Sequence, residues 1–504
     1  ATLAELSYKR LLLGSRLLAE QWVKRFGPGQ ERIGVLLPNV NAMPVTLLSC
    51  WAANKIPAVL NYSTGPGVLR DCIRLAGLKR VISSRAFVAR AGLDVAMLQA
   101  AGVEITWLEE ARGAISSTAK LRAFLPGGGS RFASGGPRPE ETAVILFTSG
   151  SEGEPKGVEL SHRNVLANIQ QMLSVVDLMD SDRFFNALPL FHCFGLTVGL
   201  LLPLVTGSFV FLYVSPLHYR VVPAAFYALN CTVFFGTNTF LAGYARKAHP
   251  YDFRTMRYLF AGAEKLQEQT IALWARKFGV RILQGYGATE CSPCVSADLP
   301  IQPQPGSVGQ FLPGIEHRLE PVAGISETEE THGSPAPTGA PTEQHPVAHG
   351  TVGRLFVRGP NIMKGYLNAQ ANAAFQALQG WYDTGDIARV DPDGFVYILG
   401  RLKRFAKVSG EMVSLTAVED ALSASFTGFG PRFALAVISK PDEAKGEKLI
   451  VVSNEPKLTI EAVRHALHER GFGNLAIPRE LRVLRDIPRL GTGKVNVREL
   501  ERMS

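Results

Sequence analysis

The sequence is poor in cysteine and contains no internal repeat. Its six cysteines are scattered among 504 residues, which argues against a secreted disulfide scaffold and indicates a reducing compartment. The N-terminus has no charged start followed by an apolar core and a small-residue cleavage site, so we expect no signal peptide. The first residue is Ala rather than Met, which suggests a processed chain or a piece of a longer one.

Long apolar runs are also scarce. One stretch, residues 187–214, carries no charge and exceeds the roughly 20 residues that cross a bilayer. His192, Pro203 and Gly207 interrupt it. We therefore predict a buried strand, a helix and a second strand here rather than a membrane span.

The overall composition is that of a globular protein. Hydrophobic residues make up 46% of the chain and charged residues 19%, which excludes full-length disorder and collagen-like structure. The length predicts about two to four core-bearing units. The net charge of +9 fits an acidic partner, an anionic substrate or a membrane surface, but it does not separate them.

Apolar patterning over the first 285 residues alternates between helical and strand periods. This alternation predicts an α/β fold with parallel or mixed sheets flanked by helices. Helices are predicted at 5–25, 43–53, 161–173 and 266–278. Strands are predicted at 33–38, 57–61, 80–83, 103–108, 143–147, 208–214, 232–235, 257–261 and 281–285.

Two segments break this pattern. Residues 126–139 are rich in Gly, Ser and Pro and are interpreted as a flexible linker. Residues 321–350 lack apolar periodicity and are interpreted as a disordered surface insertion. The three histidines of the insertion, His332, His345 and His349, are irregularly spaced beside no cysteine, which argues against a metal site.

The sequence pattern changes after Gly400 to a basic and then amphipathic stretch, and we predict a domain boundary there. Residues 1–400 would form a large domain and residues 401–504 a small, mobile α+β domain. The small domain is predicted to contain helices at 415–424 and 458–470 and strands at 432–439, 448–453 and 481–485. Residues 402–504 hold 17 basic and 13 acidic side chains, an excess of four positive charges.

The strongest local motif is VILFTSGSEGEPKG at 144–157. Glycines let the backbone approach a polyphosphate closely, hydroxyl and amide groups bind its oxygens, and a lysine adds a positive charge. It is not a Walker A loop, because no Ser or Thr follows the lysine and the glycine spacing differs. A plain surface turn is the alternative. The candidate phosphate ligands are Thr148, Ser149, Gly150, Ser151, Gly153 and Lys156.

A second motif, GYGATE at 285–290, follows an apolar strand. Tyr286 offers a flat face to a base, Thr289 offers a hydroxyl to a phosphate, and Glu290 offers a hard oxygen ligand to Mg²⁺. Gly285 and Gly287 flank the tyrosine. Taken alone, the motif is equally typical of a strand-end turn.

Three further motifs lie in the last quarter of the chain. WYDTGDI at 381–387 contains Asp386, whose carboxylate could accept both hydroxyls of a ribose; Asp383 and Asp386 could equally form a turn pair. GRLK at 400–403 contains Arg401 and Lys403 at the predicted boundary. PRLGTGKV at 488–495 places Lys494 between small residues.

In this order the five motifs make the chain resemble the adenylate-forming superfamily over nearly its whole length. The resemblance implies binding of ATP and Mg²⁺, with residues 148–157 as the phosphate loop and Glu290 as the metal ligand. It implies an adenine wall of Gly262, Ala263 and Glu264 (within AGAE at 261–264) with Tyr286. Asp386 and Arg401 would hold the ribose, Lys403 would be the hinge, and Lys494 the catalytic lysine. Glu152 departs from the threonine usual in the family.

A narrower likeness is to the acyl-acyl carrier protein synthetases, carried by LPLFHCFGLTVGLLLPLVTG, LFAGAEKLQE, GPNIMKGYL and KRFAKVSGEMVSL. The likeness implies a fatty acid substrate, acyl carrier protein as partner, and no nucleic acid. It also implies a fused or associated lysophospholipid acyltransferase at the cytoplasmic side of a bacterial inner membrane. That acyltransferase needs a His and an Asp separated by four residues. No histidine here has this spacing, so we expect that half to be absent from this chain.

The mechanism that the resemblance implies has two steps. A carboxylate attacks the α-phosphate of ATP, and a phosphopantetheine thiol then attacks the acyl-adenylate. Lys494, Thr289, Glu290 and His192 are the candidate catalytic residues, with His192 at the carboxylate end of an acyl tunnel. The alternative for His192 is a core histidine.

Two other functions stay open at this stage. A fatty acyl-CoA synthetase would share the first step and differ in its thiol, and CoA phosphates would also favour a basic small domain. The candidate carrier contacts are Arg404, Lys407, Arg432, Arg479 and Arg482. A non-catalytic nucleotide-binding module is disfavoured by the joint presence of Lys494, Glu290 and Asp386. Cys291-Ser-Pro-Cys294 has redox-motif spacing but no second pair.

Overall fold

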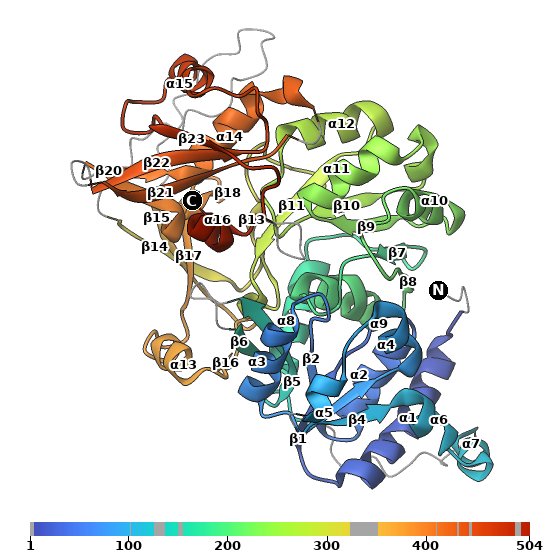
Figure 1. Cartoon of the computed structure of the whole chain (residues 1–504). Coiled ribbons are helices and arrows are strands. Elements are labelled where there is room, and N and C mark those ends of the chain that lie inside the picture. The colour runs from blue at the N-terminus through green and yellow to red at the C-terminus, as the bar shows by residue number, and fades with distance from the viewer. Residues whose placement is uncertain are drawn as a thin grey trace. The chain divides into compact units, whose positions relative to one another are not determined.

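The computed structural model describes residues 5–100, 102–124, 137–149, 155–322, 351–409, 411–430, 433–442, 446–488 and 495–503. The predicted linker core at 126–136 and insertion at 323–350 lie outside these residues. The chain divides into two compact units (Figure 1). Unit 1 comprises residues 1–303, 311–315 and 358–382, and unit 2 comprises 304–310, 316–357 and 383–504. The predicted boundary at residue 400 stays a prediction.

The first sheet of unit 1 is mixed. Its strand order is β16-β6-β5-β2-β1-β3-β4, in which β5, β2, β1, β3 and β4 are parallel, while β6 pairs antiparallel with both β5 and β16. The strands are β1 (Glu31–Val35), β2 (Lys55–Val59), β3 (Arg80–Ser83), β4 (Glu104–Trp107), β5 (Thr142–Ser149), β6 (Pro155–Ser161) and β16 (Gly365–Tyr366). The pairing of β16 with β6 joins segments that are 200 residues apart in the sequence.

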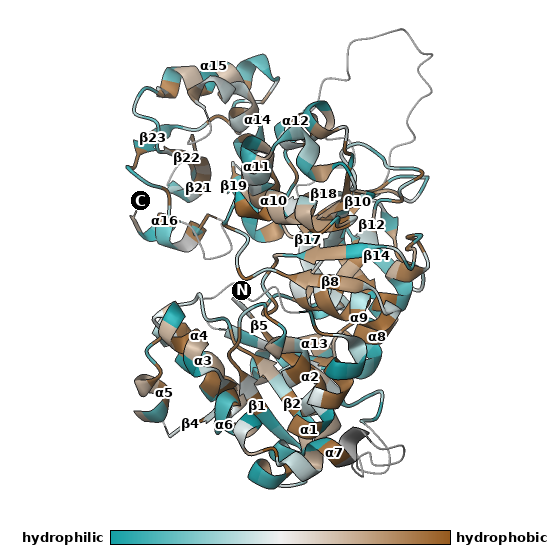
Figure 2. Ribbon diagram, turned by 90° about the vertical axis from the view of Figure 1, so that its right-hand side faces the viewer, coloured by the Kyte–Doolittle hydropathy of each residue, from teal (hydrophilic) through white to brown (hydrophobic). Residues whose placement is uncertain are grey.

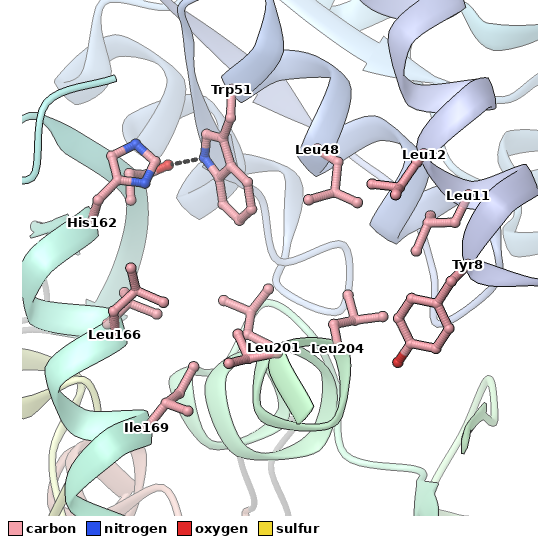
Figure 3. Close-up of a pocket in the computed structure, with 13 residues that line it drawn as sticks. Tyr8, Leu11, Leu12, Leu48, Trp51, His162, Leu166, Ile169, Leu201 and Leu204 are labelled. Atoms are coloured by element: carbon pink, nitrogen blue, oxygen red, sulfur yellow. Dashed lines mark hydrogen bonds between the residues drawn. The ribbon is translucent and has the colours of Figure 1, made fainter. Parts of the chain in front are cut away.

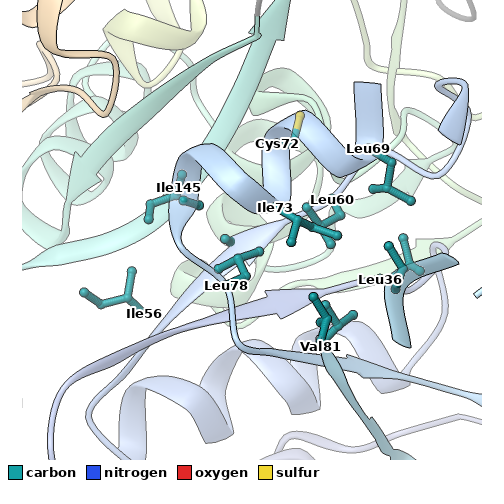
Figure 4. Packing of buried hydrophobic residues seen from close by; sticks show 13 residues of the cluster. Leu36, Ile56, Leu60, Leu69, Cys72, Ile73, Leu78, Val81 and Ile145 are labelled. Atoms are coloured by element: carbon teal, nitrogen blue, oxygen red, sulfur yellow. The ribbon is translucent and has the colours of Figure 1, made fainter. Parts of the chain in front are cut away.

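Helices connect the parallel strands of this sheet, as the alternating pattern predicts. Those of this region are α1 (Tyr8–Phe26), α2 (Ala42–Ala52), α3 (Pro66–Ala76), α4 (Arg85–Ala91), α5 (Ala96–Ala100), α6 (Leu108–Gly113), α7 (Ser117–Phe124) and α8 (His162–Leu173). Helix α3 is amphipathic, and Figure 2 shows hydrophobic and hydrophilic residues along its ribbon. Its buried Leu69, Cys72 and Ile73 pack on Leu36, Leu60 and Val81 of the sheet region (Figure 4).

The second sheet of unit 1 contains the run β12-β11-β10-β9-β7-β8. All neighbours are parallel except β11 and β12. The strands are β7 (Arg183–Asn186), β8 (Phe209–Leu212), β9 (Val233–Gly236), β10 (Tyr258–Ala261), β11 (Ile282–Gly287) and β12 (Cys294–Ala297). The associated helices are α9 (Leu202–Thr206), α10 (Val221–Ala228), α11 (Asn238–Lys247) and α12 (Glu268–Phe278).

The uncharged stretch 187–214 follows strand β7 rather than containing it. Residues 187–193 form a loop, a π-helix η1 (Phe194–Leu201) leads directly into α9, and strand β8 follows. The predicted helix and second strand of this stretch are therefore confirmed, but its predicted first strand is wrong, because the preceding strand ends at Asn186. Within the described part of the chain, no helix combines the length and apolar character needed to cross a membrane.

Unit 2 holds two smaller sheets. One has the strand order β14-β15-β17-β18. The other contains β20-β19-β22-β21, with β23 paired to β22. Their strands are β14 (Glu316–Glu320), β15 (Thr351–Arg358), β17 (Tyr382–Val390), β18 (Val396–Arg401), β19 (Phe405–Val408), β20 (Glu411–Ser414), β21 (Leu435–Asp442), β22 (Gly446–Ser453) and β23 (Glu480–Val483).

The C-terminal sheet has a hydrophobic core on each face. Alternate residues of a strand point to opposite faces, so Val437 and Val451 join one cluster while Ile438 and Ile450 join the other. Helices α14 (Leu415–Ser425) and α15 (Ile460–Glu469) contribute to the first cluster, and Leu500 of α16 (Val497–Met503) contributes to the second. Each predicted helix and strand of the C-terminal hundred residues is present, with ends shifted by a few residues.

Candidate functional site

Four parallel strands of the second sheet end at one edge, and residues singled out from the sequence lie at the ends of three of them, β7, β10 and β11. The loop with His192 follows β7, Thr237 follows β9, AGAE closes β10, and GYGATE begins within β11. In open parallel sheets ligands bind outside the carboxyl ends of the strands. This edge is therefore the candidate nucleotide site.

The residues predicted to form an adenine wall lie together at this edge. Ala261 pairs with Gln284, so Gly262 and Gly285 follow at neighbouring positions. A Cβ at Gly262 would lie 3.3 Å from the Gly285 carbonyl oxygen and 3.4 Å from the Phe194 ring. This close approach brings together the segments that follow β7, β10 and β11. Tyr286 is half-buried in β11.

Glu264 carries an unusual buried oxygen. Its Oε2 accepts a hydrogen bond from the Thr239 amide at 2.8 Å, while its buried Oε1 has no hydrogen-bond partner among the described residues. The preceding residue, Ala263, has a φ of +66°, a conformation that non-glycine residues rarely adopt. An unpaired buried acceptor is costly, and the amino group of adenine offers the donor that Oε1 lacks.

The predicted phosphate loop joins two strands of the first sheet. In the hairpin of β5 and β6, Thr148 pairs with Lys156 and Ser149 with Pro155. Gly150, Ser151 and Gly153 lie outside the described residues. Strand β6 follows the loop, and helix α8 begins directly after this strand.

Glu290 and Lys156 are linked through Tyr366, which the sequence did not single out. The Tyr366 hydroxyl donates a hydrogen bond to Glu290 Oε1 at 2.9 Å, and Lys156 Nζ lies 5.1 Å from the centroid of the Tyr366 ring. Glu290 is 8% exposed. It lies in a short 3₁₀ helix, Thr289–Cys291, and its carbonyl accepts the Met363 amide. Lys156 and Glu290 thus contact the same tyrosine side chain, the lysine at the ring and the carboxylate at the hydroxyl.

Two tyrosines next to Glu290 stay protonated. Burial, followed by the charge of Glu290, raises the pKa of Tyr366 far above its usual range, and a hydrogen bond from Tyr382 only partly opposes this. Burial and the same carboxylate also raise the pKa of Tyr382. Both hydroxyls are therefore donors at neutral pH, which suits contact with a carboxylate.

The site offers one carboxylate, Glu290, as a ligand for Mg²⁺. Among the described residues, no group of three or more His, Cys, Asp or Glu side chains could hold a metal by itself. Mg²⁺ usually keeps several waters and binds through one or two carboxylates plus substrate phosphates. Glu290 beside the phosphate-loop lysine fits that ligand set.

In unit 2 the predicted ribose ligands lie opposite each other. Asp386 and Arg401 are paired across β17 and β18, and Arg401 Nε lies 3.2 Å from Asp386 Oδ1. The Asp386 carboxylate is nearly buried, whereas the Arg401 side chain is mostly exposed. Asp383 lies in the same strand and forms an ion pair with Arg354. Asp383 Oδ1 also accepts a hydrogen bond from the Gly385 amide at 3.0 Å, so the alternative of a turn pair stays open.

The remaining candidates have less structural definition. Lys403 is exposed in a 3₁₀ turn, Leu402–Arg404. Lys494 lies outside the described residues. His192 is half-buried and packs against Phe191 with ring centroids 4.7 Å apart. Its proposed contact with a carboxylate stays a prediction.

The Cys291-Ser-Pro-Cys294 segment is structural in character. Both thiols are free, and burial raises the pKa of Cys291 well above its usual value and that of Cys294 to about 12. Thiols that stay protonated are poor nucleophiles and poor metal ligands.

An apolar pocket of about 320 Å³ lies between helices α1, α2, α8 and α9 (Figure 3). Leu11, Leu48, Leu166 and Leu204 line it, and the Trp51 indole donates to the Ala143 carbonyl at 2.6 Å. The helical segment from Phe194 to Thr206 begins with the Phe194 ring beside Gly262. Near its other end, Leu201, Leu204 and Val205 line this pocket.

Comparison with solved structures shows the fold. The ATP-bound MatB from Rhodopseudomonas palustris has a TM-score of 0.80 and 23% identity, covering 99% of this chain and 94% of that one. The o-succinylbenzoate CoA synthetase from Bacillus subtilis, solved with ATP and a magnesium ion, has a TM-score of 0.78 and 22% identity, covering 98% and 94%. The predicted fold class, α/β with mixed sheets flanked by helices as in adenylate-forming enzymes, is confirmed.

Among characterised relatives, the long-chain-fatty-acid–CoA ligase of Salmonella typhimurium is 30% identical over 372 residues. The match covers 72% of this chain and 61% of that relative, so the chain spans less than two thirds of the relative's length. The model of the AMP-binding enzyme family matches residues 2–367, which is well over half of the chain. The chain therefore belongs to the AMP-binding enzyme family.

Proposed function

We propose that this protein activates a fatty acid with ATP and transfers it to the phosphopantetheine thiol of acyl carrier protein. The products would be the acylated carrier protein (its phosphopantetheine thioester), AMP and pyrophosphate. The observation that carries the first step is the joining of Glu290 and Lys156 through Tyr366 beside the adenine wall. Membership in the AMP-binding enzyme family supports ATP and Mg²⁺ as cofactors.

The first step brings two anions together. A carboxylate oxygen bonds to the α-phosphorus of ATP, and the bond to the bridging oxygen of pyrophosphate breaks. Bound at Glu290, Mg²⁺ would offset charge on the phosphate oxygens. Lys156 adds a fixed positive charge from β6, and Lys494 is proposed to bridge the carboxylate and the α-phosphate. Preorganised charges of this kind act where negative charge develops.

Substrate recognition is assigned to the chain's own residues. Gly262 and Tyr286 would flank the adenine, and the free Glu264 Oε1 would accept its amino hydrogen. Asp386, held by Arg401, would accept the ribose hydroxyls. For the acyl chain, the apolar pocket at the end of the helical segment Phe194–Thr206 favours an apolar substrate. The Salmonella relative, named for a long-chain fatty acid, supports the same choice.

In the second step the thiol sulfur bonds to the acyl carbon, AMP leaves, and the thiol proton passes to solvent. The small domain is proposed to move about Lys403 between the two steps, as a loop residue at a boundary can absorb a backbone change. The acyl carrier protein is proposed because of the narrower sequence likeness. A fused or associated acyltransferase and a peripheral location at the inner membrane belong to the same proposal.

The second candidate function is a long-chain acyl-CoA synthetase. It shares the adenylation step and differs only in the thiol. The Salmonella ligase, whose name specifies CoA as the acceptor, favours this alternative. The two functions therefore differ in one measurable product.

A side-by-side assay tests the proposal. Purified protein is given a fatty acid, ATP and Mg²⁺ with either acyl carrier protein or CoA, and the thioester is measured by mass spectrometry. We expect the acylated carrier protein as the main product. For Lys494→Ala we expect ATP–pyrophosphate exchange to fall by about 100-fold or more. Efficient thioester formation with CoA and none with the carrier would establish the alternative. Near-normal exchange in Lys494→Ala would contradict the role of that lysine.

A further inference from the structure

Tyr366 touches two groups of opposite charge. Its hydroxyl donates to Glu290 Oε1 at 2.9 Å, and its ring face receives Lys156 Nζ at 5.1 Å from the centroid. The three residues come from different elements: a 3₁₀ turn after β11, strand β6 and strand β16. The Tyr366 side chain therefore contacts both Glu290, which follows a strand of the second sheet, and Lys156, which lies in the first sheet of unit 1.

The position of Tyr366 is fixed on several sides. Its backbone pairs with Val158 across β16 and β6, and its amide donates to Asn372 Oδ1 at 3.0 Å. The Phe375 ring packs edge-on, with centroids 6.4 Å apart. The ring thus has a single supported orientation.

This arrangement keeps a lysine and a buried carboxylate from pairing directly. A lysine ammonium and a carboxylate in contact attract strongly in a low-dielectric site, and such a pair would occupy the oxygens that a divalent cation needs. The Tyr366 ring gives Lys156 a moderate cation–π contact instead. Its hydroxyl uses one site on Glu290, and a carboxylate has about four acceptor sites.

We propose that Tyr366 is a positioning residue that orients Glu290 for a divalent cation and holds Lys156 beside it for phosphate. The inference rests on the proposed ATP-binding function and goes beyond it by assigning a role to a residue that touches neither nucleotide nor metal in that function. Groups that hold a metal ligand by hydrogen bonds typically contribute 10- to 100-fold to metal affinity.

The test measures ATP binding rather than turnover. Isothermal titration calorimetry of the full chain, without fatty acid, follows ATP affinity as Mg²⁺ is varied and again in EDTA. For Tyr366→Phe we expect about tenfold more Mg²⁺ for half of the maximal effect and an unchanged affinity in EDTA. Tyr366→Leu removes the ring contact as well, so its affinity in EDTA should also fall.

Matched variants separate positioning from general damage. Tyr258→Phe removes a hydroxyl that donates to the Asp177 carbonyl at the opposite end of β10, and it should behave as wild type. In a Glu290→Gln background, Tyr366→Phe should add little, because the ligand it orients is already altered. If Tyr366→Phe does not fold, Asn372→Ala, which loses the hydrogen bond from the Tyr366 amide, should shift the Mg²⁺ dependence in the same direction.

The outcomes that overturn the inference are distinct from those that overturn the function. An unchanged or tightened Mg²⁺ dependence in Tyr366→Phe, with normal Mg²⁺-dependent ATP binding in wild type, would overturn the positioning role alone. An equal loss of ATP affinity with Mg²⁺ and in EDTA would show a merely structural role. Wild-type protein without Mg²⁺-dependent ATP binding would overturn both proposals.

Discussion

Asp182 is a residue whose buried charge supports the second sheet from the edge opposite the candidate site. Its side chain is fully buried, and it accepts hydrogen bonds from the Thr232 hydroxyl at 2.6 Å, from the Met179 amide at 2.8 Å and from Arg257. Thr232 and Arg257 each immediately precede a strand of the sheet, β9 and β10. This carboxylate therefore ties together the starts of three neighbouring strands.

At the residue scale, we expect Asp182→Asn to lower the free energy of unfolding by about 3 kcal/mol at pH 7, as for breaking a buried, hydrogen-bonded charge pair. Urea denaturation measures the change. Asp71→Asn is the matched control, since its pair with Arg74 is exposed and should contribute less than about 1 kcal/mol. Equal losses in the two variants would contradict this account.

The same residue predicts a pH dependence. Burial raises the pKa of Asp182, but the hydrogen bonds from Thr232 and Arg257 outweigh it, so the net pKa lies below the usual 3.8. A carboxyl group with a lowered pKa in the folded state stabilises the protein above its unfolded pKa, and that contribution disappears as the pH falls through the folded value. The difference between wild type and Asp182→Asn should therefore narrow below about pH 4.

At the scale of single elements, the π-helix η1 depends on two glycines at its contacts with β7 and the following loop. A Cβ at Gly195 would lie 2.3 Å from the Pro189 carbonyl oxygen, and one at Gly199 would lie 2.4 Å from the Asn186 amide. Asn186 in turn donates to the Gly195 carbonyl at 3.0 Å. The helix can approach the strand only where side chains are missing.

We therefore expect Gly195→Ala to destabilise unit 1 by about 1–3 kcal/mol, because the clash is with backbone that cannot move aside. In an ordinary helix the same change is stabilising. Gly14→Ala in α1 provides the control, since its Cβ would have only an ordinary contact with Val45 at 3.8 Å. Urea denaturation of both variants distinguishes them by sign. A stabilised Gly195→Ala would show that η1 can move off the loop.

At the scale of the whole molecule, charge is the property that bears on a protein partner. Two of the five cations named as carrier contacts are engaged within the fold: Arg404 with Glu419 and the Val437 carbonyl, and Arg482 with Glu480. Arg432 lies outside the described residues. Lys407 and Arg479 are exposed and are now the better candidates.

We expect the charge reversals Lys407→Glu and Arg479→Glu to raise the KM for acyl carrier protein, and salt to have the same effect. The screening length falls from about 10 Å at 0.1 M to about 3 Å at 1 M salt, and exposed charges act mainly on association. ATP–pyrophosphate exchange should not change, because the first step does not involve the carrier. Arg90→Glu on α4, also exposed, is the control. A carrier KM insensitive to both salt and charge reversal would exclude docking through these cations.

The sequence by itself determined the positions of several helices and strands and, in outline, the motifs. Apolar patterning located helix 161–173 and strand 80–83 within a residue of their observed bounds. The helix repeats its buried positions at helical spacing, and the strand is a short run of mostly buried residues. The strand predicted at 281–285 corresponds to β11 (Ile282–Gly287). Tyr286 lies near the end of this strand, and Glu290 follows it. Asp386 and Arg401 were chosen together for the same ribose, and they are paired across two strands.

Only the tertiary structure decided how these motifs meet. Tyr366 lies in a two-residue strand that pairs with residues 158–159, a span too short for any periodic pattern and too distant in sequence for a local one. The contacts of its hydroxyl with Glu290 and of its ring with Lys156 arise from packing among three separate segments. Likewise, the π-helix depends on steric fit against β7 and not on propensity. Long-range packing of this kind leaves no local signature, so a sequence can specify which groups are present without revealing which of them touch.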